Sequence, residues 1–85
     1  MSTKTFINKE VSVTSVYFKN NFKTFPKRIE LDGDCYTFSE GLQYLVKTGQ
    51  QITRIFEMTD GEANYRLKSD ESQQTWTLLA ITRTV

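Results

Sequence analysis

The sequence predicts an α+β domain in which β-structure dominates, with five to six short antiparallel strands in a bent sheet or a small, partly open barrel. Two Asp-Gly pairs, Asp32-Gly33 and Asp60-Gly61, each stand between segments in which apolar and polar residues alternate. A segment with helical spacing, residues 37–49, separates the two hairpins that these pairs predict. We expect one short helix there and a single domain over residues 1–85, with ends that fray at 1–9 and 83–85.

The first predicted strand covers residues 11–18, where side chains of two kinds alternate. A loop follows up to Pro26. Phe18, Phe22 and Phe25 stand four and three residues apart, which is helical spacing, although two asparagines and the proline weaken such a helix. The sequence does not choose between strand, loop and helix for residues 17–25.

The stretch ELDGDCYTF predicts a hairpin with a type I′ turn at Asp32-Gly33, because both central residues of that turn take φ > 0. In this register Leu31 faces Asp34 and Ile29 faces Tyr36. The apolar residues then share one face of the hairpin and the polar residues share the other. A shift of one residue would mix the two sets.

The stretch EMTDGEANYRL predicts a second hairpin, with Asp60-Gly61 at its turn. Met58 then faces Ala63, and Phe56 faces Tyr65. One face of this hairpin carries the apolar residues Ile52, Phe56, Met58, Ala63, Tyr65 and Leu67. A last strand is predicted over residues 75–82, with apolar residues on both faces in its second half.

Residues 37–49, TFSEGLQYLVKTG, predict a helix of two to three turns between the hairpins. Thr37 and Glu40 have the spacing of a capping box, and Gly49 is a typical C-terminal stop. Gly41 weakens the helix by about 1 kcal/mol relative to alanine. The apolar residues recur at helical intervals and would lay a stripe on the sheet: Phe38, Leu42, Leu45 and Val46.

The residue inventory excludes several kinds of chemistry. The chain has no histidine and one cysteine, Cys35, which excludes His-based catalysis and zinc sites built from histidine or several thiolates. Its acidic clusters do not match the spacing of a calcium loop, and it has no glycine motif that binds phosphate. We therefore expect no catalytic residue, no metal and no cofactor, and a binding function in place of an enzyme.

Compartment is predicted from what the sequence lacks. A single cysteine suits a reducing environment, and no apolar run approaches the ~20 residues of a membrane helix. The first residues do not form the apolar stretch of a secretory signal. We expect a soluble, cytoplasmic protein with no membrane partner.

Charge is uneven along the chain. Residues 1–28 hold six basic residues and one acidic residue, for a formal charge of +5, whereas residues 29–85 hold five basic and nine acidic residues, for −4. In residues 17–28, YFKNNFKTFPKR, four aromatic residues interleave with four bases, a combination typical of proteins that bind single-stranded nucleic acid. The predicted nucleic-acid site is Lys19, Phe22, Lys23, Phe25, Lys27 and Arg28. The alternative is that these rings close the core while the lysines face water.

A second hypothesis is a protein-interaction or self-associating domain that does not bind nucleic acid. An open sheet has edges that can pair with a peptide strand or with a second copy, giving a homodimer. The outward face of the second hairpin, with Arg66 and Lys68, is a further candidate surface. Neither the sheet edge nor the outward face of the second hairpin identifies a particular partner.

The stretches PKRIELDGDCYTF and NYRLKSDESQQTWTL resemble a layout of small bacterial β-rich domains of unknown function. The likeness covers about residues 25–79. It depends on Arg28, Gly33, Tyr36, Tyr65, Arg66, Leu67, Trp76 and Leu78. A second tryptophan, expected near Tyr44, is missing. The resemblance implies a compact β-rich fold and no assigned activity.

Overall fold

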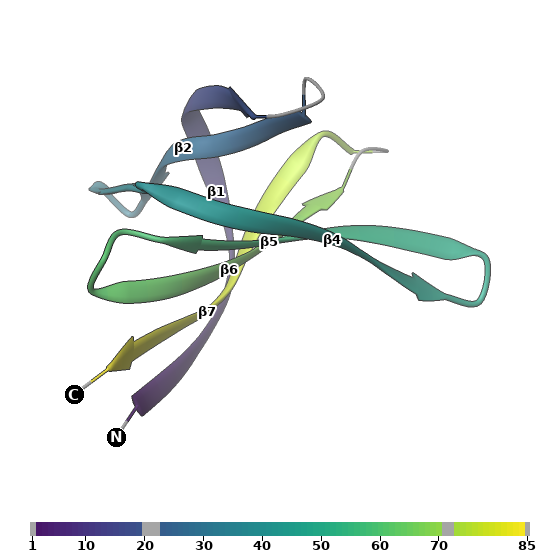
Figure 1. Cartoon of the computed structure of the whole chain (residues 1–85). Coiled ribbons are helices and arrows are strands. Elements are labelled where there is room, and N and C mark those ends of the chain that lie inside the picture. The colour runs from purple at the N-terminus through teal and green to yellow at the C-terminus, as the bar shows by residue number, and fades with distance from the viewer. Residues whose placement is uncertain (1, 20–22, 71–72, 85) are drawn as a thin grey trace.

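The computed structural model describes residues 2–19, 23–70 and 73–84, and within them the chain forms one antiparallel sheet (Figure 1). The strands are β1 (Ser2–Lys19), β2 (Lys23–Leu31), β3 (Asp34–Thr37), β4 (Glu40–Thr48), β5 (Gln51–Thr59), β6 (Ala63–Asp70) and β7 (Thr75–Thr84). Their order across the sheet is β3-β2-β1-β7-β6-β5-β4. The two edge strands, β3 and β4, are consecutive in the chain and are joined by only two residues.

The predicted α+β class is wrong, because the described residues form seven strands and no helix, where one helix and five to six strands were expected. The predicted helix over 37–49 is replaced by the end of β3, a short linker and β4. Gly41 supplies the physical reason: a Cβ atom at this position would overlap the Sδ of Met58. Glycine therefore allows β4 to pack closely on β5. Of the expected apolar stripe, only Phe38 is buried.

Strand β1 turns the corner of the sheet. Its first half pairs with β7 and its second half pairs with β2. The register with β7 shifts between Phe6 and Lys9, around Asn8, whose φ is 53°. A second shift, against β2, lies between Val13 and Ser15. Such bulges bend and twist a strand, so one long strand can serve both parts of the sheet.

Both ends of the described chain belong to paired strands, and fraying at 1–9 and 83–85 stays a prediction. Pairing of β1 with β7 begins at Ser2 opposite Thr84, and Arg83 is also opposite Ala63 of β6. The described residues contain no helix with the length and apolar character that crossing a bilayer requires.

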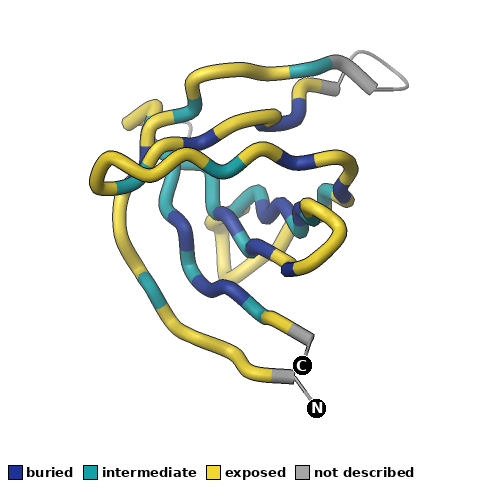
Figure 2. Tube along the Cα trace, turned by 90° about the vertical axis from the view of Figure 1, so that its left-hand side faces the viewer, coloured by how far each residue is buried: buried dark blue, intermediate teal, exposed yellow. Residues whose placement is uncertain are grey.

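The sheet folds over onto itself around an aromatic core (Figure 2). Phe25 of β2 meets Phe56 of β5 edge to face, with ring centroids 5.5 Å apart, although the two strands are far apart in the sheet order. Tyr36 of β3 lies at the same centroid distance from Tyr65 of β6. Phe38, in the linker, lies 5.0 Å from the Tyr65 ring. These contacts hold the β2–β3 end of the sheet against β5 and β6.

The first hairpin has the predicted register. Leu31 pairs with Asp34 and Ile29 with Tyr36. Both turn residues have positive φ, 52° at Asp32 and 86° at Gly33, as a type I′ turn requires.

The second hairpin keeps its predicted faces but shifts its register by two residues. Met58 pairs with Tyr65, where Ala63 was expected, and Phe56 pairs with Leu67. A shift of two preserves the alternation of side chains, so the apolar face still points into the core. The predicted two-residue turn was wrong because the loop is longer and is organised by Asp60.

Asp60 holds this longer loop through its carboxylate. Its Oδ1 accepts hydrogen bonds from the amides of Glu62 and Ala63, both at 2.8 Å, and its Oδ2 accepts one from the Tyr65 hydroxyl, also at 2.8 Å. Burial raises the pKa of Asp60, but these hydrogen bonds outweigh it and leave the pKa below its ordinary value. Burial, followed by the hydrogen bond to Asp60, raises the pKa of Tyr65 to about 12.

Candidate functional site

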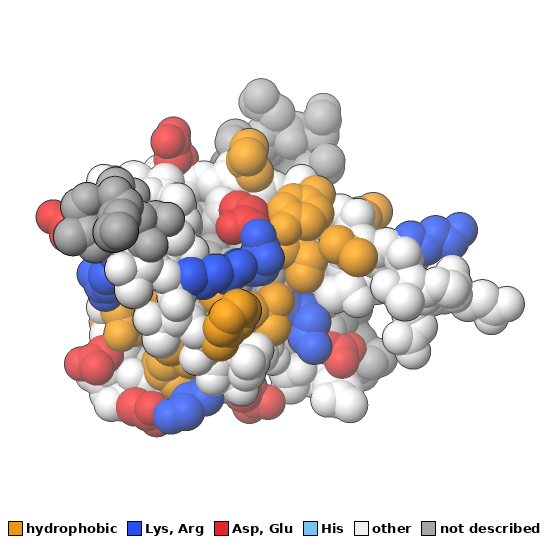
Figure 3. Space-filling view, turned by 90° about the horizontal axis from the view of Figure 1, so that it is seen from below, with side chains coloured by type: hydrophobic (Ala, Val, Ile, Leu, Met, Phe, Trp, Pro, Cys, Tyr) orange, Lys and Arg blue, Asp and Glu red, His pale blue; other side chains and the backbone are white. Residues whose placement is uncertain are grey.

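Exposed apolar side chains gather on one hairpin. Seven large hydrophobic residues are exposed among the described residues, and five of them lie on β4 or at the start of β5: Leu42, Tyr44, Leu45, Val46 and Ile52. We call residues 42–53 the hairpin tip. In Figure 1 the tip extends past the other strands, and in Figure 3 hydrophobic side chains lie beside charged ones near its base. Apolar surface concentrated in this way is typical of an interaction site.

The register of β4 with β5 distributes these residues over the two faces of the hairpin. Leu42 pairs with Glu57, Tyr44 with Ile55 and Val46 with Thr53, so these three residues of β4 share the outer face of the sheet. Leu45 and Ile52 lie on the opposite face, which continues the core side beyond the core. The tip is therefore apolar on both faces.

One edge of β4 pairs with β5, and no other described strand pairs with its second edge. Thr48 pairs with Gln51 across a two-residue turn, and such a pair exchanges backbone hydrogen bonds. Because the pattern alternates, the backbone groups of Gln43, Leu45 and Lys47 point away from β5. Strand β4 thus presents donors and acceptors away from β5 between Gln43 and Lys47.

The two edges of the sheet differ in how they resist pairing. Strand β3 has four residues, with an acidic residue and a cysteine at its start. Short length and charge are devices that block edge pairing. Strand β4 is more than twice as long, has no proline, and carries charge only at Glu40 and Lys47. The β4 edge is the less protected of the two.

A polar network stabilises the outer face beside the tip. The Tyr44 hydroxyl donates a hydrogen bond of 3.0 Å to Oε1 of Glu57, and the same oxygen accepts one from Nε of Arg66. Burial and then the bond to Glu57 raise the pKa of Tyr44, while Glu57 raises the pKa of Arg66. The network links β4, β5 and β6 and fixes the Tyr44 ring over the outer face.

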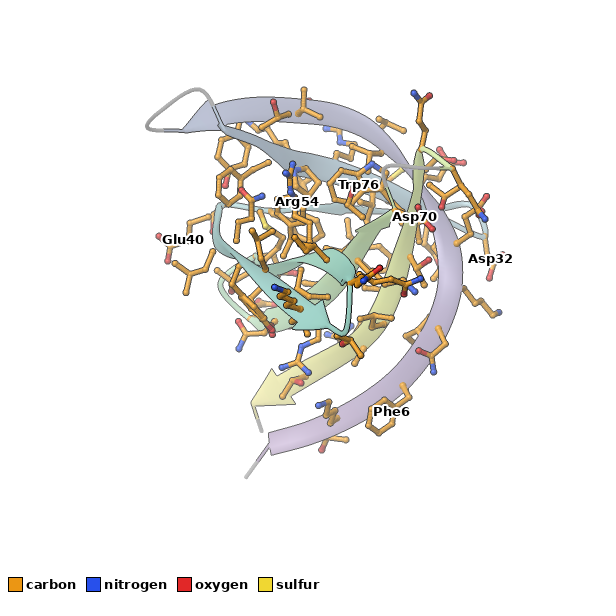
Figure 4. All side chains as sticks on the ribbon, turned by 90° about the vertical axis from the view of Figure 1, so that its right-hand side faces the viewer. Phe6, Asp32, Glu40, Arg54, Asp70 and Trp76 are labelled. Atoms are coloured by element: carbon orange, nitrogen blue, oxygen red, sulfur yellow. The ribbon has the colours of Figure 1, made fainter. Side chains whose placement is uncertain are left out.

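Arg66 and Lys68, the secondary surface predicted from sequence, lie on β6 and are half-buried. Arg66 belongs to the network with Glu57. Lys68 pairs with Ile55 and borders a cavity of about 570 Å³ below the tip, together with Leu45, Arg54 and Asp70. Figure 4 labels Arg54 together with Asp70, which borders the same cavity.

Of the predicted nucleic-acid residues, Lys19 ends β1 and Lys23 begins β2, and their backbones are opposite each other in the pairing of these strands. Phe22 lies outside the described residues. Phe25 is 4% exposed and stacks on Tyr17 at 5.5 Å between ring centroids. Phe25 therefore belongs to the core, as the alternative interpretation expected.

Lys27 and Arg28 are exposed on β2, as the nucleic-acid hypothesis needs. The backbone oxygen of Lys27 accepts a hydrogen bond from the amide of Phe38, and Nε of Arg28 donates one of 3.2 Å to the Thr37 hydroxyl. Both bonds position β3 and the linker. Nucleic-acid binding stays a prediction of the sequence.

Sequence reasoning missed the apolar residues of the tip as surface residues, because their spacing also fits a helical stripe. The alternation of Leu42, Tyr44 and Val46, followed by a glycine turn at Gly49, was the signal for a hairpin strand. Cys35 is exposed opposite Glu30 in the first hairpin. Within the described ranges no three His, Cys, Asp or Glu side chains form a group that could hold a metal ion.

Comparison with protein-family models, with curated proteins and with solved structures found no match. The resemblance to small bacterial β-rich domains therefore stays a prediction, and the function is argued from the geometry of the chain.

Proposed function

We propose that this protein is a protein-interaction module that binds an extended polypeptide strand along the free edge of β4. The concentration of exposed apolar side chains on the hairpin tip carries this proposal. An added strand would take up the backbone groups that β4 directs outward, and its alternate side chains would cover the apolar residues on both faces.

The strand edge and the apolar side chains contribute to binding in different ways. Main-chain hydrogen bonds to an edge give affinity for any extended strand, whereas side-chain contacts give specificity. Leu42 and Leu45 are 68% and 58% exposed and lie on opposite faces of β4. Burial of apolar area is favourable by about 25 cal/mol per Å², so a strand with apolar residues at alternate positions gains most.

Selection from a displayed library of nine-residue peptides tests the proposal. We expect enrichment of sequences with alternating apolar residues and no proline. Binding of a selected peptide should disappear when its alternate backbone amides are methylated, since methylation removes the donors of the ladder.

The protein variant Leu45→Pro removes one outward amide, and proline is tolerated on an edge strand at such a position. We expect Leu45→Pro to weaken peptide binding at least about tenfold with little change in the circular dichroism spectrum. Lys27→Glu on β2 is the matched control and should bind like the parent. Failure of the library to enrich, or full binding by Leu45→Pro, would contradict the proposal.

A further inference from the structure

We propose that the strand bound at β4 is an acidic peptide that runs antiparallel to β4. It places an aspartate or glutamate opposite Lys47 and, after it, three apolar residues opposite Leu45 and its two neighbours. This inference rests on the proposed function and names the chemistry of its partner.

The contact is limited to the part of β4 between Gln43 and Lys47, because Gly41 is buried. The backbone groups of Gln43, Leu45 and Lys47 point away from β5, so these residues form hydrogen-bonded pairs with an antiparallel peptide. The two residues between them form non-hydrogen-bonded pairs, in which side chains approach most closely. Antiparallel pairing is chosen because it is more stable per residue than parallel pairing.

Charge on the hairpin tip selects an acidic partner. Lys47 is the only charged residue of the tip, it is exposed, and no described residue forms an ion pair with it. Lys47 pairs with Ile52 and lies on the same face of β4 as Leu45, whereas Glu40 lies on the other face at the far end of the strand. Opposite charges that face each other across two strands stabilise their pairing, and like charges destabilise it. A carboxylate opposite Lys47 therefore supplies a counter-charge that no described residue provides.

The three apolar positions of the peptide follow from the side chains that they face. The Tyr44 hydroxyl donates its hydrogen bond to Glu57, so the ring presents apolar surface to a neighbouring strand. Val46 lies on the same face, and both residues are 41% exposed. Leu45, on the opposite face, is 58% exposed. Apolar residues at all three positions remove this surface from water, and the position of the acidic residue sets the direction of the peptide.

Three labelled synthetic peptides test the inference through fluorescence anisotropy at about 50 mM salt. The first contains Glu-Val-Leu-Val-Thr, the second contains the reversed order Thr-Val-Leu-Val-Glu, and the third has lysine in place of the glutamate of the first. Glycine and serine flank each segment. We expect the parent protein to bind the first peptide about two- to fivefold more tightly than the reversed one, and the lysine peptide most weakly. These differences should shrink at about 500 mM salt, because exposed charges are screened.

The protein variant Lys47→Glu should reverse the preference and bind the lysine peptide more tightly than the glutamate peptide. Lys27→Glu on β2 changes the net charge by the same amount and should keep the order of the parent. Equal or tighter binding of the reversed or lysine peptide by the parent, or an unchanged order in Lys47→Glu, would overturn the inference and leave the proposed function intact. Absence of binding by all three peptides would end the inference and, if the peptide library also fails to enrich, the proposed function.

Discussion

Replacing Gly41 with alanine distinguishes the observed strand from the helix that the sequence favours. The substitution should raise the free energy of unfolding if residues 37–49 form a helix and lower it if they form the observed strand. In a helix over 37–49 the change would stabilise the protein by about 1 kcal/mol, the difference between the helix propensities of the two residues. In the observed strand it adds a Cβ atom that overlaps Met58 Sδ and lies 2.9 Å from the Glu57 carbonyl oxygen.

The cost depends on which neighbour can move. The Met58 side chain is flexible but completely buried, so its displacement disturbs the core. The Glu57 oxygen belongs to the backbone of β5 and cannot move without shifting the strand. Adding a methyl group to a well-packed site costs about 1–3 kcal/mol. We expect Gly41→Ala to lower the free energy of unfolding by that amount, and the melting temperature by about 4–8 °C for each kcal/mol.

Urea unfolding followed by fluorescence provides the assay. Trp76 is the single tryptophan and its ring lies 5.0 Å from that of Phe56, so its emission reports the core. In a Met58→Ala background the contact with the Met58 side chain is gone but the Glu57 oxygen remains, and there we expect Gly41→Ala to cost less than in the parent protein. Equal or greater stability of the single Gly41→Ala variant would refute the close packing of β4 on β5.

Three further outcomes follow from the turns, the core and the basic stretch. Gly33→Val and Gly61→Val should each lower the free energy of unfolding in urea by at least about 1 kcal/mol. The φ angles are 86° at Gly33 and 96° at Gly61, and no atom lies within 4 Å of a Cβ added at either position. The cost is therefore backbone strain and not a steric clash. Because the pKa of the Tyr65 hydroxyl is raised in the folded protein, this hydroxyl ionises at a lower pH in the unfolded chain. The hydroxyl therefore contributes at most about 2–3 kcal/mol to the free energy of unfolding. This contribution is complete below pH 10 and is lost as the pH rises to about 12. Tyr65→Phe should make that alkaline decline shallower, and an unchanged slope would contradict the assignment. Titration of a labelled single-stranded oligonucleotide at about 50 mM salt tests the basic stretch: binding that weakens in Lys27→Glu would support nucleic-acid recognition, and no binding at high micromolar protein would exclude it.

The sequence predicts the first hairpin correctly because a two-residue turn and side-chain alternation leave one register. It predicts the faces of the second hairpin but not its register. The carboxylate of Asp60 organises a longer loop with the hydroxyl of Tyr65, five residues on, and this contact is not visible in the turn motif.

The helix error has a different origin. Leu42, Leu45 and Val46 fit a helical stripe only if they are buried, and in the structure all three are exposed. Local spacing cannot show that Gly41 packs against Met58, seventeen residues away. The sequence therefore did not predict the exposed apolar residues of the candidate site. It predicted an exposed sheet edge only as a general hypothesis, without naming the strand.

Residue-resolved amide hydrogen exchange tests most directly whether β4 pairs with β5 along one edge while its other edge is unpaired between Gln43 and Lys47. The measurement is made on dilute protein. We expect protected amides at Leu42, Tyr44 and Val46, which point to β5, and rapid exchange at Gln43 and Leu45, which point outward. Continuous protection through all five residues in the monomer, or none at any of them, would contradict the account.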